Sequence, residues 1–229
     1  CLLAIVFVPA GATVIATGDV YDARLLASNV VADEFIAPPT IPNVLGTKEM
    51  WCTGDLTRLD ANCTVIAGSK ELDASMMRLT LTGGPNVQEA IRLPLSGSRT
   101  RVYLHCNITP HGYTGHGTFA QWTIKLLNAS NQGVQIIHNY GDNTLKILSH
   151  SGATKASVAL PIEADINKSI YVVLDCNRDT VEVEVNGTAV STAAFTEAST
   201  ITKVEIYGAL VDVCATTTDI VAPFLLAAS

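Results

Sequence analysis

The stretch VEVEVNGTAV, residues 181–190, carries the clearest structural signal in the sequence. Three valines alternate with two glutamates, and the side chains of an extended strand alternate between its two faces. Asn186-Gly187 then supplies two residues that readily adopt positive φ, which a two-residue type I′ hairpin turn requires. The stretch therefore predicts a β-hairpin that buries its valines and exposes its glutamates.

Composition limits the class of protein to which this hairpin belongs. The chain has 229 residues, of which 48% are hydrophobic and 15% charged, so it can bury a large core and should not be disordered. The formal net charge is −7, with only 14 lysines and arginines and no basic run. The electrostatic footprint of a nucleic-acid-binding protein is absent, and binding to an anionic membrane surface is disfavoured.

Short segments with strand character follow one another along the chain, with Gly, Asn, Asp and Ser turns between them. The only possible helix is a short stretch between residues 19 and 35. The regular spacing of the short strands and turns predicts an all-β sandwich or barrel. The expected strands are 62–67, 77–82, 89–94, 100–108, 118–128, 133–140, 144–150, 155–160, 169–177, 180–185, 188–193, 202–211 and 220–226.

The order of five of these segments resembles a known fold family. They are FAQWTI (119–124), VQII (134–137), LKI (145–147), IYVVLD (170–175) and VEVEVNG (181–187). Together they resemble the concanavalin A-like, laminin G-like jelly roll over roughly residues 50–226. The resemblance implies an antiparallel two-sheet jelly-roll sandwich, and it does not imply one activity.

The resemblance implies that a calcium ion could be held by oxygen atoms of the loops. Asp142 with Asn143, or Asp212 with Asp219, would supply oxygen ligands, although neither pair forms a recognisable ligand string. Calcium is therefore possible, but we expect no cofactor and assign no calcium site.

The N-terminal segment differs from the rest, because residues 1–18 contain no charge. It is too short, and too interrupted by Pro9 and Gly11, to span a membrane as a helix. A proline-rich connector follows at 37–46, so we expect an arm and connector over 1–46 and a jelly-roll domain over 47–229. Alternation in the arm places Leu3, Ile5 and Phe7 on one face. It predicts a strand taken up either by the domain's own sheet or by a neighbouring subunit.

Candidate disulfides and glycosylation patterns favour an extracellular or virion-surface location. Cys106 and Cys176 point inward at corresponding places in two core strands and are either a buried disulfide or two small buried residues. Cys52 and Cys63 enclose a short polar loop and make a plausible second bridge. Asn-X-Ser/Thr acceptor patterns for glycosylation occur at Asn62, Asn107, Asn128, Asn167 and Asn186.

Two segments resemble catalytic strands of jelly-roll enzymes, and both lack essential features. KELDASM (70–76) has two alternating carboxylates like the laminarinase-type glucanases, but the third position is Ser75. Gln135 and His138 resemble an alginate-lyase element with one residue too many, which puts them on opposite strand faces. We interpret the first as a decoy and His138 as a surface residue.

Histidines and aromatic residues offer weaker binding signals. His105, His111 and His116 are close in sequence, but they lie in a Gly/Pro/Thr-rich segment without metal-ligand spacing, which favours a polar loop. Tyr113, Tyr140 and Trp51 are candidate sugar contacts, whereas Trp122 sits in a strand and should be core.

Three functional hypotheses remain, ranked by these features. The first is a non-enzymatic structural subunit of an extracellular assembly, such as a viral coat or a cell-surface fibre. It would be joined by self-association through its apolar arm, with a possible glycan-adhesion role. The alternative is a stand-alone glycan-binding, lectin-like module. A polysaccharide lyase or glycoside hydrolase ranks third, because its catalytic residues are incomplete.

Overall fold

A computed structural model describes most of the chain. The chain divides into two compact units, residues 1–43 and 44–229, which are described separately. The described residues are 4–6, 20–22, 48–53, 56–73, 78–85, 87–111, 118–139, 142–161, 166–192, 195–211 and 215–228.

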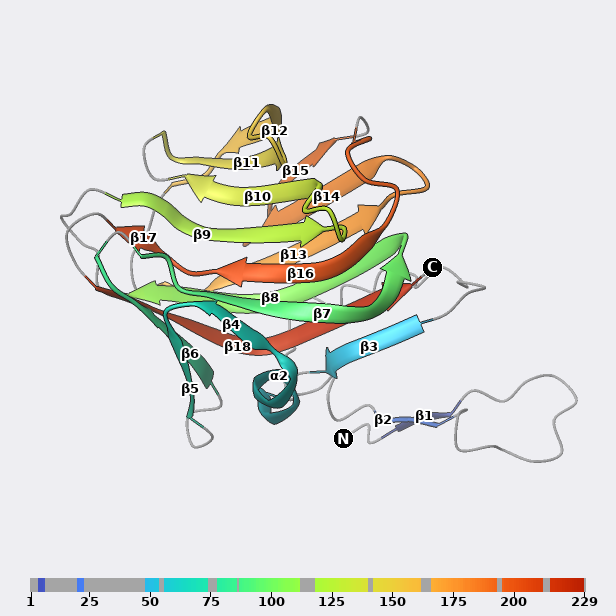
Figure 1. The fold of residues 1–229 in the computed structure, drawn as a ribbon, viewed down its shortest axis with the longest axis horizontal. Coiled ribbons are helices and arrows are strands. Elements are labelled where there is room, and N and C mark those ends of the chain that lie inside the picture. The colour runs from blue at the N-terminus through green and yellow to red at the C-terminus, as the bar shows by residue number, and fades with distance from the viewer. Residues whose placement is uncertain are drawn as a thin grey trace, which may run out of the picture. The chain divides into compact units, whose positions relative to one another are not determined.

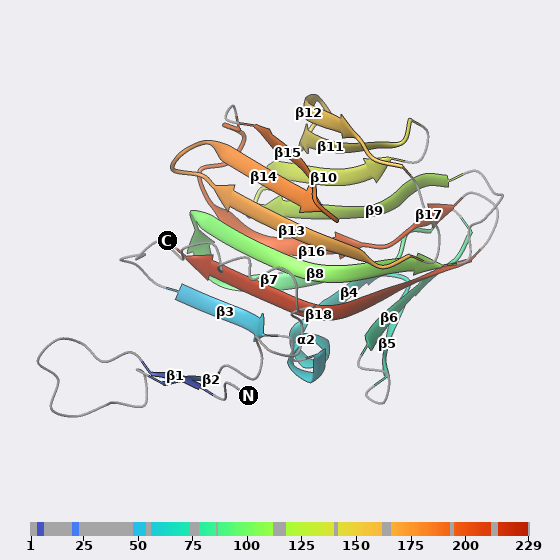
Figure 2. The same cartoon turned by 180° about the vertical axis from the view of Figure 1, so that it is seen from behind.

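The second unit is built from two antiparallel β-sheets. One, the front sheet, faces the viewer in Figure 1, and the other, the back sheet, faces the viewer in Figure 2. The front sheet has the order β12 (Thr154–Ala159), β11 (Thr144–Ser149), β10 (Gly133–Asn139), β9 (Thr118–Leu127), β16 (Ile201–Tyr207), β7 (Ala90–Arg99), β4 (Thr64–Ala67), with β17 (Leu210–Val211) beside β9. The back sheet has the order β15 (Thr188–Thr192), β14 (Thr180–Val185), β13 (Lys168–Asp175), β8 (Arg101–His111), β18 (Thr216–Ala228), β6 (Arg78–Gly83), β5 (Ser69–Asp73), with β3 (Lys48–Thr53) beside β18.

The hydrophobic core lies between the two sheets. In β8, every second residue from Val102 to Pro110 is buried and the residues between them are partly exposed. The same alternation runs through β11 and β14. Each fully buried valine or leucine stabilises the fold by about 1.5–3 kcal/mol. This arrangement confirms the predicted antiparallel jelly-roll sandwich.

The hairpin of residues 180–192 forms as predicted. Asn186 and Gly187 have φ angles of 47° and 81°, both positive as a type I′ turn requires. The Asn186 side chain also accepts a hydrogen bond from the Ser169 backbone N–H over 2.8 Å. This asparagine therefore holds the β14–β15 turn against the start of β13.

Residues 48–73 differ from expectation. The segment predicted to begin a strand at Asn62 is preceded by a helix, α2 (Leu56–Asn62), and by β3. Leu56, Leu59 and Cys63 are buried at helical spacing, and this signal was not recognised from the sequence. The segment KELDASM contributes its first four residues to β5.

Within the first unit, a short antiparallel pair is described. β1 (Ala4–Val6) pairs with β2 (Val20–Asp22), so Ile5 lies opposite Tyr21. Leu3 and Phe7 are outside the described residues, as is most of the possible helix at 19–35. Among the described residues, no helix has the length and apolar character needed to cross a membrane.

The predicted disulfides are not present. The β8–β13 register places Cys106 opposite Ile170, whereas Cys176 follows Asp175 and donates its N–H to the Thr100 carbonyl. Six residues of strand span about 20 Å, and a disulfide needs Cα atoms within about 7 Å. The disulfide alternative for this pair is therefore wrong, and these are two small buried thiols. Cys63 is also a thiol, so the bridge to Cys52 is not formed.

His138 was predicted on the surface, and this prediction is wrong. Its side chain is 0% exposed, and its Nε2 atom lies 3.0 Å from the carbonyl oxygen of Leu160. Trp122 is buried beside it, with ring centroids 5.9 Å apart, which confirms that tryptophan as core. Gln135 and His138 do lie on opposite faces of β10, as predicted.

Candidate functional site

The outward face of the front sheet carries a hollow of about 260 Å³. Its floor is made by residues of four neighbouring strands, β7, β16, β9 and β10, and its rim by the turns that end β9 and β11. Most of its lining side chains are polar, in contrast to the sandwich interior. The lining residues are Arg92, Lys125, Leu127, Asn131, Gln135, His150, Glu205 and Tyr207.

Sheet register brings four of these residues into one row. Arg92 of β7 lies opposite Glu205 of β16, Glu205 lies opposite Lys125 of β9, and Lys125 lies opposite Gln135 of β10. Directly opposed residues on one face of an antiparallel sheet have Cβ atoms about 4.5–5.5 Å apart. The row therefore places alternating charges side by side across the floor.

Glu205 is the centre of the polar network. Arg92 Nε donates to its Oε1 atom over 2.8 Å, and the Tyr207 hydroxyl donates to its Oε2 atom over 2.7 Å. The carboxylate is almost completely enclosed, with 4% of its side chain exposed. Burial, together with the hydrogen bond to Glu205, raises the pKa of Tyr207. Both oxygens of Glu205 are thus engaged by neighbours, which suits a positioning group better than a general acid or base.

Lys125 supplies the second cation of the floor. Its Nζ atom lies 4.2 Å from the centroid of the Tyr207 ring, a cation–π geometry. No described residue accepts a hydrogen bond from this ammonium group. Burial lowers the pKa of Lys125, and the nearby Glu205 charge partly opposes that effect. The ammonium group is therefore incompletely solvated, and its N–H donors are available to a ligand.

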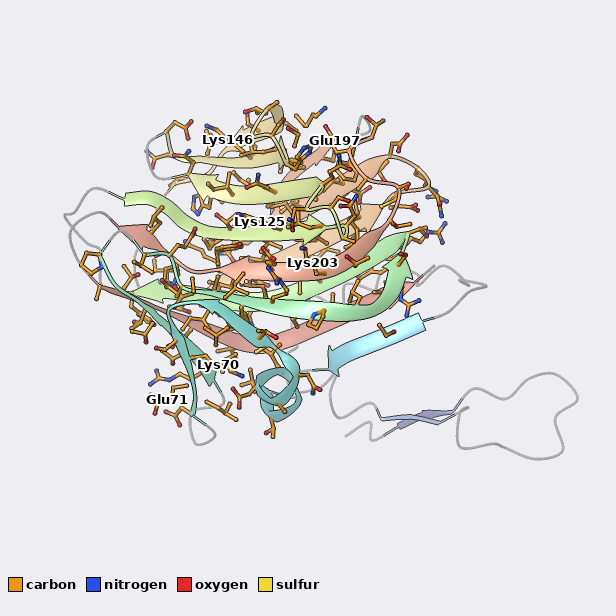
Figure 3. All side chains as sticks on the ribbon, in the orientation of Figure 1. Lys70, Glu71, Lys125, Lys146, Glu197 and Lys203 are labelled. Atoms are coloured by element: carbon orange, nitrogen blue, oxygen red, sulfur yellow. The ribbon has the colours of Figure 1, made fainter. Side chains whose placement is uncertain are left out.

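The rim of the hollow is polar as well. Lys203 of β16 donates to Asn131 Oδ1, and Asn131 adopts a φ of 62° in the β9–β10 turn. Gln135 Nε2 donates to the His150 carbonyl over 3.0 Å. Figure 3 labels Lys125 and Lys203 on the front sheet, on the adjacent strands β9 and β16.

The described lining of this hollow includes none of the aromatics that the sequence predicts to contact sugar. Tyr113 and Tyr140 lie outside the described residues, and Trp51 is described only in its β3 backbone. The residues that do line the hollow were missed, because Arg92, Lys125 and Glu205 look like ordinary exposed positions of alternating strands. Only the strand order reveals that they meet.

Those predicted histidine and carboxylate positions that the structure describes do not form a metal site. His105 and His111 share the outward face of β8, but His105 contacts Ser169 and His111 contacts Asp219. The Asp219 carboxylate also accepts from Thr80 and Arg78, so it does not fit a calcium ion. Within the described part of the chain, no group of three histidine, cysteine, aspartate or glutamate residues could hold a metal.

The other predicted calcium ligands give no better fit. Asp142 is engaged by Lys146 and Thr144, and these hydrogen bonds, led by that from Lys146, lower its pKa. Asn143 follows in the turn with a φ of 52°, and Asp212 and His116 lie outside the described residues.

The carboxylates of a glycoside hydrolase are likewise not assembled by the described residues. Glu71 is exposed on β5, and Asp73 lies 3.7 Å from Arg78. In the hollow, Glu205 is the one carboxylate among the lining residues, whereas glycoside hydrolysis uses two.

The five sequons occupy different environments. Asn62, Asn167 and Asn186 are exposed, while Asn107 is half-buried on the outward face of β8. Asn128 is half-buried, and its Oδ1 atom accepts two backbone N–H groups of the β9–β10 turn. Whether any of them carries a glycan stays a prediction.

Sequence comparison identifies no relative. No protein-family profile matches the chain. No curated protein is similar in sequence.

Structural comparison finds many similar folds. The metal-free carbohydrate recognition domain of Emp46p matches with a TM-score of 0.60 and 13% identity, over 75% of this chain and 90% of that one. Basic winged bean lectin with Tn-antigen matches with a TM-score of 0.55 and 10% identity, over 74% and 93%. A galectin-like protein of unknown function from Bacillus subtilis matches with a TM-score of 0.53 and 9% identity, over 79% and 94%.

A sialidase is also similar, with a TM-score of 0.54 and 10% identity over 73% of this chain, but the match covers only 17% of that enzyme. At these identities the comparisons establish the fold alone. The domain has the concanavalin A-like jelly-roll fold.

Proposed function

We propose that this protein is a non-enzymatic, lectin-like module that binds a glycan in the hollow of the front sheet. The observation that carries the proposal is the row of Arg92, Glu205, Lys125 and Gln135 across an open sheet face. Carbohydrate binding needs several polar groups held in fixed positions, and strands hold them more rigidly than loops do. Structural neighbours named as lectins and carbohydrate recognition domains support the same class.

These observations favour the alternative hypothesis from the sequence over the structural-subunit hypothesis. Nothing in the described residues provides support for a viral coat or a fibre. Self-association through the arm and an extracellular setting remain proposals that rest on the sequence.

The experiment is a glycan array, followed by calorimetric titration of the best ligand against variants of the hollow. Gln135→Trp places a large ring in the hollow and should weaken binding by more than tenfold. Gln132→Trp, at an exposed position of the nearby β9–β10 turn, is the matched control and should bind normally. Equal melting temperatures would show that both variants fold. Equal binding by the two variants, or no binding to any glycan by the wild-type chain, would refute the proposal.

A further inference from the structure

We infer that the glycan bound in this hollow carries an acidic substituent, a carboxylate or a sulfate, which Lys125 and Arg92 bind together. This inference rests on the proposed function and names the class of its ligand.

The first support is the local charge. Arg92 and Lys125 lie on either side of Glu205, and Lys203 donates to Asn131 on the rim, so three cations and one carboxylate lie at the hollow. The chain as a whole carries a formal charge of −7, so this positive site lies on an acidic protein. A hollow with an excess of positive charge concentrates ligands of negative charge.

The second support is the set of hydrogen-bond donors that remain. Arg92 uses its Nε for Glu205, and no described residue accepts from its two Nη groups, while 39% of its side chain is exposed. Lys125 contacts the Tyr207 ring and donates to no described residue. The two remaining donor groups therefore come from neighbouring sides of Glu205 and face the same hollow.

The third support is that the carboxylate and the Asn131 amide oxygen are already engaged, so the remaining donors of the hollow outnumber its remaining side-chain acceptors, Gln135 Oε1 and the His150 ring. Both oxygens of Glu205 are engaged by Arg92 and Tyr207. Asn131 Oδ1 accepts from Lys203. The hydroxyl groups of a neutral sugar both donate and accept, whereas a carboxylate or sulfate only accepts. An anion also offsets the incomplete solvation of the Lys125 ammonium, since charge-assisted hydrogen bonds are about twice as strong as neutral ones.

The test uses the full chain and pairs of glycans that differ only in charge. The probes are oligogalacturonate against its methyl ester, and a sulfated galactan oligosaccharide against its desulfated form. Calorimetric titration at low and high sodium chloride should show at least tenfold tighter binding of one or both acidic forms, and loss of that preference with salt. The pair that responds distinguishes a carboxylate from a sulfate.

Variants then assign the effect to the hollow. Lys125→Gln should weaken binding of the acidic form by about tenfold to a hundredfold, the value of one hydrogen bond to a charged group. Lys125→Arg should retain much of the affinity. Arg178→Gln removes a charge from the β13–β14 turn, where 73% of the side chain is exposed, and should bind as the wild type does.

The two proposals fail in different ways. If acidic and neutral forms bind equally, and Gln135→Trp still weakens binding by more than tenfold, the inference about charge is wrong and the lectin function stands. If Lys125→Gln leaves the preference for the acidic form intact, the assignment to Lys125 is wrong. If none of these forms and no glycan of the array binds the wild-type chain, both proposals are overturned.

Discussion

Glu89 provides a test of how burial and hydrogen bonding compete at one carboxyl group. The residue precedes β7 and is 0% exposed. Thr218 Oγ1 donates to its Oε1 atom over 2.7 Å, and Thr216 Oγ1 donates to its Oε2 atom over 3.2 Å. A Cβ atom added at Gly208 would overlap this carboxyl group, so the backbone is packed closely around it. Glu89 therefore joins the start of β7 to β18.

The perturbation is Glu89→Gln, which retains the shape but replaces one oxygen by an amide NH₂. The new side chain can present its single oxygen to only one of the two threonines. The loss is one buried hydrogen bond, about 1–3 kcal/mol in the free energy of unfolding. A cost of the same size remains at acidic pH, because the neutral Glu89 carboxyl group has one hydroxyl donor, whereas the glutamine amide brings a second buried N–H donor that needs a partner.

The pH dependence has a defined sign. Burial raises the pKa of Glu89 above its ordinary value of 4.5, against the opposing hydrogen bonds led by that from Thr218. The folded state therefore holds the proton more tightly than the unfolded state does. The stabilising contribution is complete below the unfolded pKa and falls, by about 1.4 kcal/mol per pH unit, as the pH rises through the folded pKa.

The assay is urea denaturation followed by tryptophan fluorescence, between pH 4 and pH 8. The stability advantage of the wild type over Glu89→Gln should be largest near pH 4 and should shrink as the pH rises. Glu182→Gln, at an exposed position of β14, is the control and should change stability by less than about 0.5 kcal/mol. If the advantage of the wild type grew with pH, the hydrogen bonds from the threonines would lower the pKa of Glu89 by more than burial raises it. That result would refute the reasoning.

Three further predictions concern the backbone and the cysteines. Gly208→Ala should destabilise the domain by about 1–3 kcal/mol in urea, because the new methyl group meets Glu89 and Thr218. Gly84→Ala, with nothing within 4 Å, should be nearly neutral, and equal effects would contradict the packing argument. Gly187→Ala should cost about 1–2 kcal/mol despite open space around it, because its φ is 81°; an unchanged denaturation midpoint would show that the turn relaxes. Iodoacetamide at pH 8 without reductant should leave Cys176 unmodified in the native chain, because burial raises its pKa to about 12, and should label it after unfolding. Mass spectrometry should find thiols at Cys63, Cys106 and Cys176. A disulfide-linked peptide that contains any of these three would contradict the structure.

Much of the fold could be read from local pattern. Alternation along the strand of residues 180–185 predicted which valines are buried, and Asn186-Gly187 predicted the type I′ turn. These features depend on neighbours in the chain, because strand geometry repeats every two residues and a tight turn needs particular backbone angles. The helix α2 was readable in the same way from its buried spacing but was overlooked.

What the sequence by itself determined is therefore the class of elements, their inward faces and most of their turns. Tertiary structure alone decided which strands are neighbours and in which register they pair. Cys106 and Cys176 share a sheet face, yet six residues of register separate them. Arg92, Lys125 and Glu205 are far apart in the chain, yet β16 lies between β7 and β9 and brings all three into one row. The physical reason is that strand order follows from how the whole chain buries its apolar surface, which no local stretch specifies.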